Sequence, residues 1–203
     1  LLRAEPLIRP DRVYLLGHSM GGMLAPRIDA EGGAFAGLIF WAGTPRTLDA
    51  LILEQNEASL AAMPPEQRAA AAPLVQALRE QFAALPRMAE EDAQHTHILG
   101  NLWAWYFKEM LAHPPEEYLR RLTKPVLVLQ GDRDAHLSVE RDFRRYEALL
   151  SAHPDAAFHL YPGLNHLFMP SPTGAIAEVL HEYQQPQAVD SQVIADIAHE
   201  GAG

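Results

Sequence analysis

Apolar residues gather in four short runs along the chain, at residues 13–16, 37–41, 126–130 and 158–161. The first three runs are apolar almost throughout, which is typical of parallel strands that are buried on both faces. Helical periodicity occupies much of the sequence between the runs, so strands and helices alternate. This alternation predicts an α/β fold with a mostly parallel sheet and right-handed crossovers.

One long segment, residues 44–123, interrupts the alternation, because it shows helical periodicity broken by prolines and no strand pattern. Apolar residues first recur with the spacing of one helix face, at Leu74, Leu78, Phe82 and Leu85. A broader apolar stripe follows over residues 99–111. One interpretation of this stripe is core packing. The alternative is a lid, whose apolar underside would face a substrate pocket.

The position of this segment between two core strands favours the lid. We therefore expect three regions in the chain. Residues 1–43 form the first part of the core, residues 44–123 form a helical cap or lid insertion, and residues 124–203 complete the core.

A serine turn directly follows the first predicted strand, in the sequence GHSMGG at residues 17–22. The pattern G-x-S-x-G between a strand and a helix is typical of a nucleophile elbow, which projects the serine hydroxyl above the sheet. Ser19 is the predicted nucleophile. Glycine is expected at positions 17 and 21 because a side chain there would collide with the neighbouring strand and helix. The helix that begins near Met20 directs its N-terminus at the site, so the Met20 N–H is the predicted oxyanion donor.

A serine nucleophile needs a base, and the base needs an acid that orients it. Two further loops meet this need, with GDRD at residues 131–134 after the third predicted strand and GLNH at residues 163–166 after the fourth. The chain order of serine, acid and histidine is the order of α/β-hydrolases. Because the carboxyl ends of parallel strands meet at one edge of a sheet, we expect the three loops to lie together.

The choice within each loop rests on position. Asp134 is favoured as the acid because it lies far enough beyond the strand to turn toward a histidine, whereas Asp132 is placed to stabilise the turn. His166 is the predicted base because it lies on the loop after the last strand. His136 lies on the acid loop, and His18 is expected to point away from the nucleophile, in a structural or pocket-lining role.

Substrate contacts are predicted at His18, Arg46 and Trp103. Arg46 follows a Gly-Thr-Pro turn, where it either touches substrate or caps the first helix of the insertion. His95 and His97 have metal-ligand spacing, but no pattern supplies a third ligand. We therefore predict neither a metal nor a cofactor.

Composition narrows the classes of partner. The 203 residues are 48% apolar, so a sizeable core is expected, and the formal net charge of −10 disfavours nucleic acid. The chain has no cysteine, which excludes a disulfide scaffold, a thiolate nucleophile and a cysteine zinc site. No apolar run approaches the roughly 18 residues of a membrane span. The cytoplasm is the expected compartment, with secretion left open.

Three motifs carry a resemblance to the serine α/β-hydrolase superfamily, and they are GHSMGG at 17–22, GDRD at 131–134 and GLNH at 163–166. Within it, residues 129–134 and 160–166 resemble capped bacterial carboxylesterases of the dienelactone-hydrolase-like and acyl-hydrolase branches. The resemblance implies an α/β-hydrolase fold with a helical cap. It also implies that Ser19, His166 and Asp134 cleave small to medium acyl esters through an acyl-enzyme, without a cofactor.

The sequence departs from the family pattern at the start of the chain. The family places its nucleophile strand in the middle of the sheet, after several earlier strands, whereas only a short segment precedes residues 13–16 here. The loop that supplies a second oxyanion N–H normally lies in that earlier part. We therefore expect an exposed edge strand, and a chain that is the C-terminal piece of a longer hydrolase.

Two classes of function follow. The first is a serine esterase, and a thioesterase, acyltransferase or peptidase would keep the same residues. The second is a non-catalytic or incomplete α/β-hydrolase segment that needs an N-terminal partner. The expected partners are a small ester substrate and either the missing segment or a second copy, paired through the exposed nucleophile strand.

Overall fold

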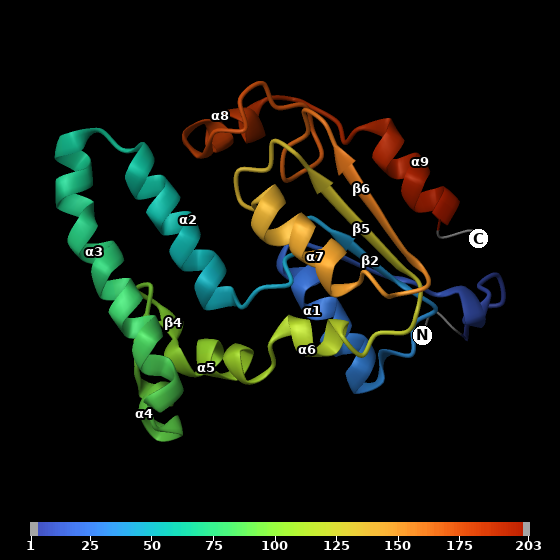
Figure 1. The fold of residues 1–203 in the computed structure, drawn as a ribbon, viewed down its shortest axis with the longest axis horizontal. Coiled ribbons are helices and arrows are strands. Elements are labelled where there is room, and N and C mark those ends of the chain that lie inside the picture. Colours follow the sequence, from blue (N-terminus) through green and yellow to red (C-terminus); the bar gives the residue numbers. More distant parts are fainter. Residues whose placement is uncertain (1–3, 201–203) are drawn as a thin grey trace. The chain divides into compact units, whose positions relative to one another are not determined.

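The computed structural model describes residues 4–200, and the chain forms two compact units (Figure 1). The core unit comprises Leu1–Pro45 and Pro115–Gly203. The helical unit comprises Arg46–Pro114. The assignment of a lid function to residues 44–123 stays a prediction.

The core unit is built on a parallel sheet of four strands in the order β1-β2-β5-β6. The strands are β1 (Leu15–His18), β2 (Leu38–Trp41), β5 (Val126–Gly131) and β6 (Ala156–Tyr161). Figure 1 shows β2, β5 and β6 side by side, and every residue of β5 is buried. The predicted parallel α/β sheet is therefore confirmed, with all four strands present.

The first strand starts two residues later than the apolar run predicted. Gly17 and His18 pair with Phe40 and Trp41 of β2, so the ladder continues beyond the apolar run and into the serine motif. Small and polar residues can pair their backbones without adding to an apolar pattern, which is why the sequence signal ended too early.

Helices of the core unit follow the strands, and they are α1 (Met20–Ile28), α6 (Pro115–Leu119), α7 (Arg144–Leu149), α8 (Val179–Gln184) and α9 (Ser191–Glu200). Shorter helical turns are η2 (Pro10–Arg12), η3 (Asp29–Gly33), η5 (Val139–Phe143) and η6 (Ile176–Glu178). Their apolar faces pack on the sheet in one buried cluster, which comprises Ala25, Leu38, Phe40, Leu119, Val126, Val128, Phe143, Tyr146 and Leu150. Phe40 of β2 stacks on Tyr146 of α7, with the ring centroids 5.3 Å apart.

The helical unit contains α2 (Leu48–Ala62), α3 (Pro65–Ala84), η4 (Leu85–Arg87), α4 (Glu90–His95) and α5 (Ala104–Ala112). Figure 1 shows α2 and α3 as a helical hairpin. Leu78, Phe82 and Leu85 are buried as their periodicity predicted, but Leu74 is 72% exposed, so the helix face is shorter than expected. Within residues 4–200, no helix has the length and apolar character that crossing a lipid bilayer requires.

The expectation of helix throughout the second apolar stripe was wrong. A two-residue antiparallel pair, β3 (His97–Ile98) and β4 (Leu102–Trp103), precedes α5. Its turn places Leu99 and Gly100 at φ angles of 54° and 83°. A left-handed backbone ends a helix, so the apolar spacing before Ala104 had no helical meaning.

The nucleophile strand β1 lies at the edge of the sheet, as predicted. Among the described residues β1 pairs with β2 alone, and Leu16 is 40% exposed. Association of another chain or segment with this edge stays a prediction.

We expect Leu38→Ala to destabilise the core unit by about 2–5 kcal/mol, because deleting a buried side chain loses its transfer free energy and leaves a cavity. Leu38 is 1% exposed and belongs to the buried cluster. Urea unfolding followed by circular dichroism measures the change. The matched control is Leu180→Ala, at a position 77% exposed, with an expected change within about 0.5 kcal/mol. Equal losses in the two variants would contradict this account of the core.

Candidate active site

Ser19 lies on a strained turn between β1 and α1. Its φ of 55° and ψ of −118° fall outside the regions that residues with a side chain favour. The turn is held by hydrogen bonds, since the Ser19 N–H donates to the Trp41 carbonyl at 2.9 Å and the Ser19 carbonyl accepts from Gly22 at 3.0 Å. Strain of this kind is stored where the surrounding structure enforces it, and it clusters at functional sites.

Close approach of the backbone explains two of the glycines in this turn. A Cβ on Gly17 would lie 2.2 Å from the Gly21 carbonyl oxygen, and a Cβ on Gly22 would lie 2.9 Å from the Cα of Gly43. The expectation for Gly17 is therefore correct. For Gly21 it was wrong, because a Cβ there would meet nothing within 4 Å. The second glycine that the fold requires is Gly22, which packs against the chain after β2.

His166 and Asp134 come together as the loop positions predicted. Their Nδ1 and Oδ2 atoms are 2.7 Å apart, the Asp134 side chain is fully buried and His166 is 7% exposed. The other oxygen of Asp134 accepts from the backbone N–H groups of His136 at 2.8 Å and Leu137 at 3.0 Å. A carboxylate only accepts hydrogen bonds, so Nδ1 carries the proton and Nε2 of a neutral His166 is left as the basic nitrogen.

Asp132 has a different partner. Its Oδ1 accepts from the backbone N–H of Gly163 at 2.6 Å, which joins the turn after β5 to the turn after β6. This is the turn-stabilising position that the sequence predicted for Asp132. The structure therefore brings Asp134, rather than Asp132, to the histidine.

Two further histidines flank His166. The ring centroids of His18 and His136 each lie 4.8 Å from that of His166. His18 Nε2 also lies 3.0 Å from the backbone oxygen of His166, so the residue before Ser19 contacts the histidine loop directly. Burial lowers the pKa of His18 below its usual value, and the hydrogen bond to the His166 carbonyl opposes this only in part. Burial also lowers the pKa of His136, and the nearby His166 lowers it further. Both flanking rings are therefore held toward their neutral forms.

Three further residues were predicted for the site, and they are Met20, Arg46 and Trp103. Met20 is the first residue of α1, where the helix dipole gives the backbone its positive end. Arg46 and Trp103 belong to the helical unit. Arg46 forms an ion pair with Glu54 of α2, and Trp103 packs on His97 with ring centroids 3.7 Å apart. Substrate contacts of Arg46 and Trp103 stay predictions.

A buried polar network below the histidine loop was missed by the sequence analysis. The Asn165 side chain oxygen accepts from the backbone N–H groups of Leu167 at 3.0 Å and Met169 at 3.1 Å, which shapes the loop around His166. Its Nδ2 donates to Glu182 at 3.3 Å, and the Ser171 hydroxyl donates to the other Glu182 oxygen at 2.6 Å.

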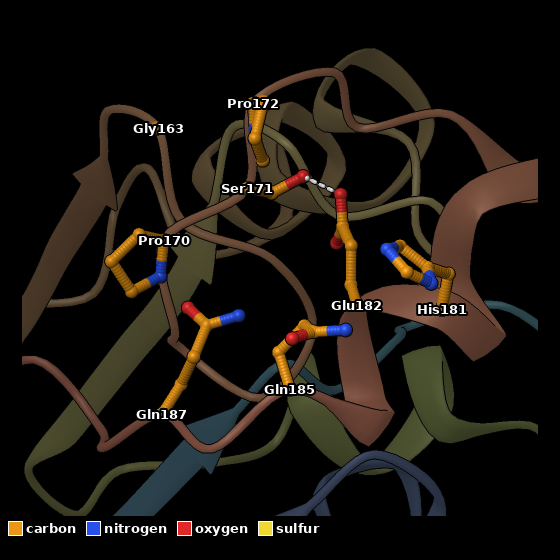
Figure 2. Close-up of a pocket in the computed structure, with 8 residues that line it drawn as sticks. All are labelled: Gly163, Pro170, Ser171, Pro172, His181, Glu182, Gln185 and Gln187. Atoms are coloured by element: carbon orange, nitrogen blue, oxygen red, sulfur yellow. Dashed lines mark hydrogen bonds between the residues drawn. The ribbon is translucent and has the colours of Figure 1, made fainter.

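Figure 2 shows Ser171 and Glu182 joined at the wall of a cavity of about 450 Å³ that Pro170 and Gln185 also line. Glu182 belongs to α8 and is 7% exposed. In the sequence it looks like any charge on an amphipathic helix. Only its bonds to Asn165 and Ser171 distinguish it, so no local signal could have identified it.

Comparison with known proteins places the chain among hydrolases. Residues 1–179 match the model of the Alpha/beta hydrolase family. Esterase EstD of Thermotoga maritima is 29% identical over 189 residues, which are 92% of this chain and 42% of EstD. Uncharacterized peptidase YtmA of Bacillus subtilis is 20% identical over 186 residues, which are 91% of this chain and 59% of YtmA.

Among solved structures, Est1E from Butyrivibrio proteoclasticus superposes with a TM-score of 0.47 and 16% identity, over 95% of this chain and 62% of Est1E. The chain spans about half the length of the curated relatives that it matches, at 42% and 59%. The family match covers most of the chain, including all three sequence motifs and all four parallel strands of the sheet. The chain therefore belongs to the alpha/beta hydrolase family.

Proposed function

We propose that this chain carries the catalytic residues of a serine hydrolase that cleaves small to medium carboxylic esters. The observation that carries the proposal is the buried 2.7 Å bond between His166 and Asp134, in the same unit as the strained Ser19. The name of the relative EstD supports an ester substrate. A buried acid that fixes the tautomer of a histidine is what a serine nucleophile requires.

Each residue has a defined role in the proposed reaction. The Ser19 hydroxyl attacks the ester carbonyl carbon while Nε2 of His166 takes its proton. The oxyanion is stabilised by the N–H of Met20 at the N-terminus of α1. The tetrahedral intermediate then collapses, the C–O bond to the alcohol breaks, and the alcohol leaves with the proton from His166.

Water completes the cycle. His166 takes a proton from the water, whose oxygen attacks the acyl carbon, and Ser19 leaves with that proton as the carboxylic acid forms. Asp134 accepts the hydrogen bond from Nδ1–H of His166 throughout and stabilises the imidazolium that forms twice in each turnover. His18, Arg46 and Trp103 are proposed to contact the substrate, with the helical unit acting as a cap.

Two alternative functions are each favoured by one observation. The name of YtmA favours a peptidase, which would use the same residues on an amide. The chain spans only 42% and 59% of the lengths of EstD and YtmA. This favours the second alternative, in which the chain is inactive until a further segment supplies the second oxyanion donor. A fluorophosphonate probe separates this second alternative, because it labels only a serine that its base has activated.

We expect Ser19→Ala to lower kcat for p-nitrophenyl butyrate by roughly 10⁴- to 10⁶-fold, because the variant has no nucleophile. The wild-type chain reacts with a fluorophosphonate at Ser19, and the variant does not. Ser151→Ala is the matched control, since Ser151 is exposed and its hydroxyl donates to a backbone carbonyl. Equal hydrolysis by the wild-type chain and Ser19→Ala would refute the proposal.

Asp134→Asn is expected to lower kcat by roughly 10⁴-fold with little change in KM, because an amide can hold His166 in the wrong tautomer. Asp132→Asn provides the comparison, with a loss below about tenfold, since an amide oxygen still accepts from Gly163. Steady-state kinetics of both variants measure the difference. A larger loss in Asp132→Asn than in Asp134→Asn would show that Asp134 is not the acid of the site.

A further inference from the structure

His18 forms a hydrogen bond that joins the first strand of the sheet to the loop after its last strand. It is the last residue of β1, and its Nε2 lies 3.0 Å from the backbone oxygen of His166, a residue 148 positions away on the loop after β6. A carbonyl oxygen only accepts hydrogen bonds, so Nε2 of His18 must carry a proton and donate it. The bond therefore has one direction, from the nucleophile strand to the histidine loop.

The sheet order explains why such a bond matters. β1 and β6 form opposite edges of the sheet, with β2 and β5 between them. Adjacent strands lie about 4.8 Å apart, so the histidine loop must cross two strands to bring His166 beside the residue that precedes Ser19. A loop that reaches this far needs an anchor at its far end.

Aromatic packing supports the crossing. Trp41, at the end of β2, meets the ring of His18 edge-on at 6.4 Å and that of Phe168 at 5.3 Å. Phe168 is fully buried and also packs on Tyr161, with ring centroids 5.7 Å apart. These contacts hold the height of the loop over the sheet. A hydrogen bond constrains the loop backbone in addition, because its strength falls steeply with distance and angle.

We propose that His18 is a positioning residue, whose Nε2–H holds the backbone of His166 so that the imidazole faces Ser19. This inference rests on the function proposed above, and it gives His18 a role in addition to the substrate contact predicted from the sequence. The donor acts through His166 and does not touch the reacting atoms.

The charges around His166 are compatible with this role. Burial lowers the pKa of His18 and of His136, so both neighbours of His166 favour their neutral forms. The ring of Tyr183 lies 6.2 Å from that of His136, and burial raises the pKa of Tyr183 to about 12, so it favours its neutral form too. Asp134 supplies the negative charge next to the ring. A neutral His18 keeps its Nε2–H bond without repelling the imidazolium that His166 becomes during turnover.

Two substitutions separate the donor from the ring. His18→Phe keeps an aromatic ring against Trp41 but has no donor. His18→Gln has no ring, yet its Nε2 is as many bonds from Cβ as Nε2 of histidine, so it can still donate to His166. His95→Phe is the matched control, because His95 also bonds a backbone carbonyl, that of Glu91 at 2.8 Å, in the helical unit.

The kinetic readout is the split between kcat and KM for p-nitrophenyl butyrate. We expect His18→Phe to lower kcat by roughly 10- to 100-fold, the size of effect that follows from a small misplacement of a reacting group. His18→Gln should recover most of that loss, and His95→Phe should match the wild-type chain. A rise in KM without a fall in kcat would make His18 a substrate contact only, and equal losses in both His18 variants would show that the donor is unimportant. Either result overturns the proposal.

A second readout does not depend on activity. The His166 Nδ1 proton, bonded to Asp134, should give a low-field proton resonance that is absent from His166→Gln. We expect the resonance to persist in the wild-type chain and His18→Gln and to broaden or shift in His18→Phe. An unchanged resonance in His18→Phe overturns the positioning role. A resonance that responds as expected, in a chain whose hydrolysis Ser19→Ala does not reduce, would refute the proposed function alone.

Discussion

The candidate site depends on one buried negative charge, the carboxylate of Asp134 beyond the end of β5. Taking a charge out of water costs several kcal/mol unless hydrogen bonds replace those to the solvent. Asp134 accepts from the backbone N–H groups of His136 and Leu137 on one oxygen and from His166 on the other. These bonds fix the loop, the ring and its tautomer together. The basic nitrogen that faces away from Asp134 is thus a result of satisfying the buried charge.

The parallel sheet sets the problem that the loops solve. Ser19 follows one edge strand and His166 follows the opposite edge strand, so neither short turn alone could bring them together. The loop after β6 crosses the carboxyl ends of the inner strands over Trp41, and Phe168 on that loop adopts a φ of 56° while fully buried. Aromatic packing holds a backbone conformation that an isolated loop would not choose. Asn165 and its buried partners brace the same loop from below.

Sequence patterns predicted those features that are local. The parallel strands and the loops that bear Asp134 and His166 each depend on a short apolar run and the residues directly after it. The pair of strands at residues 97–103 was missed because its apolar spacing imitates a helix, and the backbone turn that breaks it leaves no trace in hydropathy. Gly21 looked essential from the motif, but which glycine has close neighbours depends on the chain after β2. The buried Glu182 depends on distant partners and has no signal of its own.

The edge position of β1 also bears on the local stability of the candidate site. Parts of a folded protein open and close independently, and segments with few backbone partners open at the lowest free energy. β1 has four residues, and within the described chain its ladder is bonded on one side only. Each opening of this strand withdraws both the strained serine turn and the His18 bond to the histidine loop. Opening of this one short strand is therefore enough to separate these groups, even where the rest of the sheet remains closed.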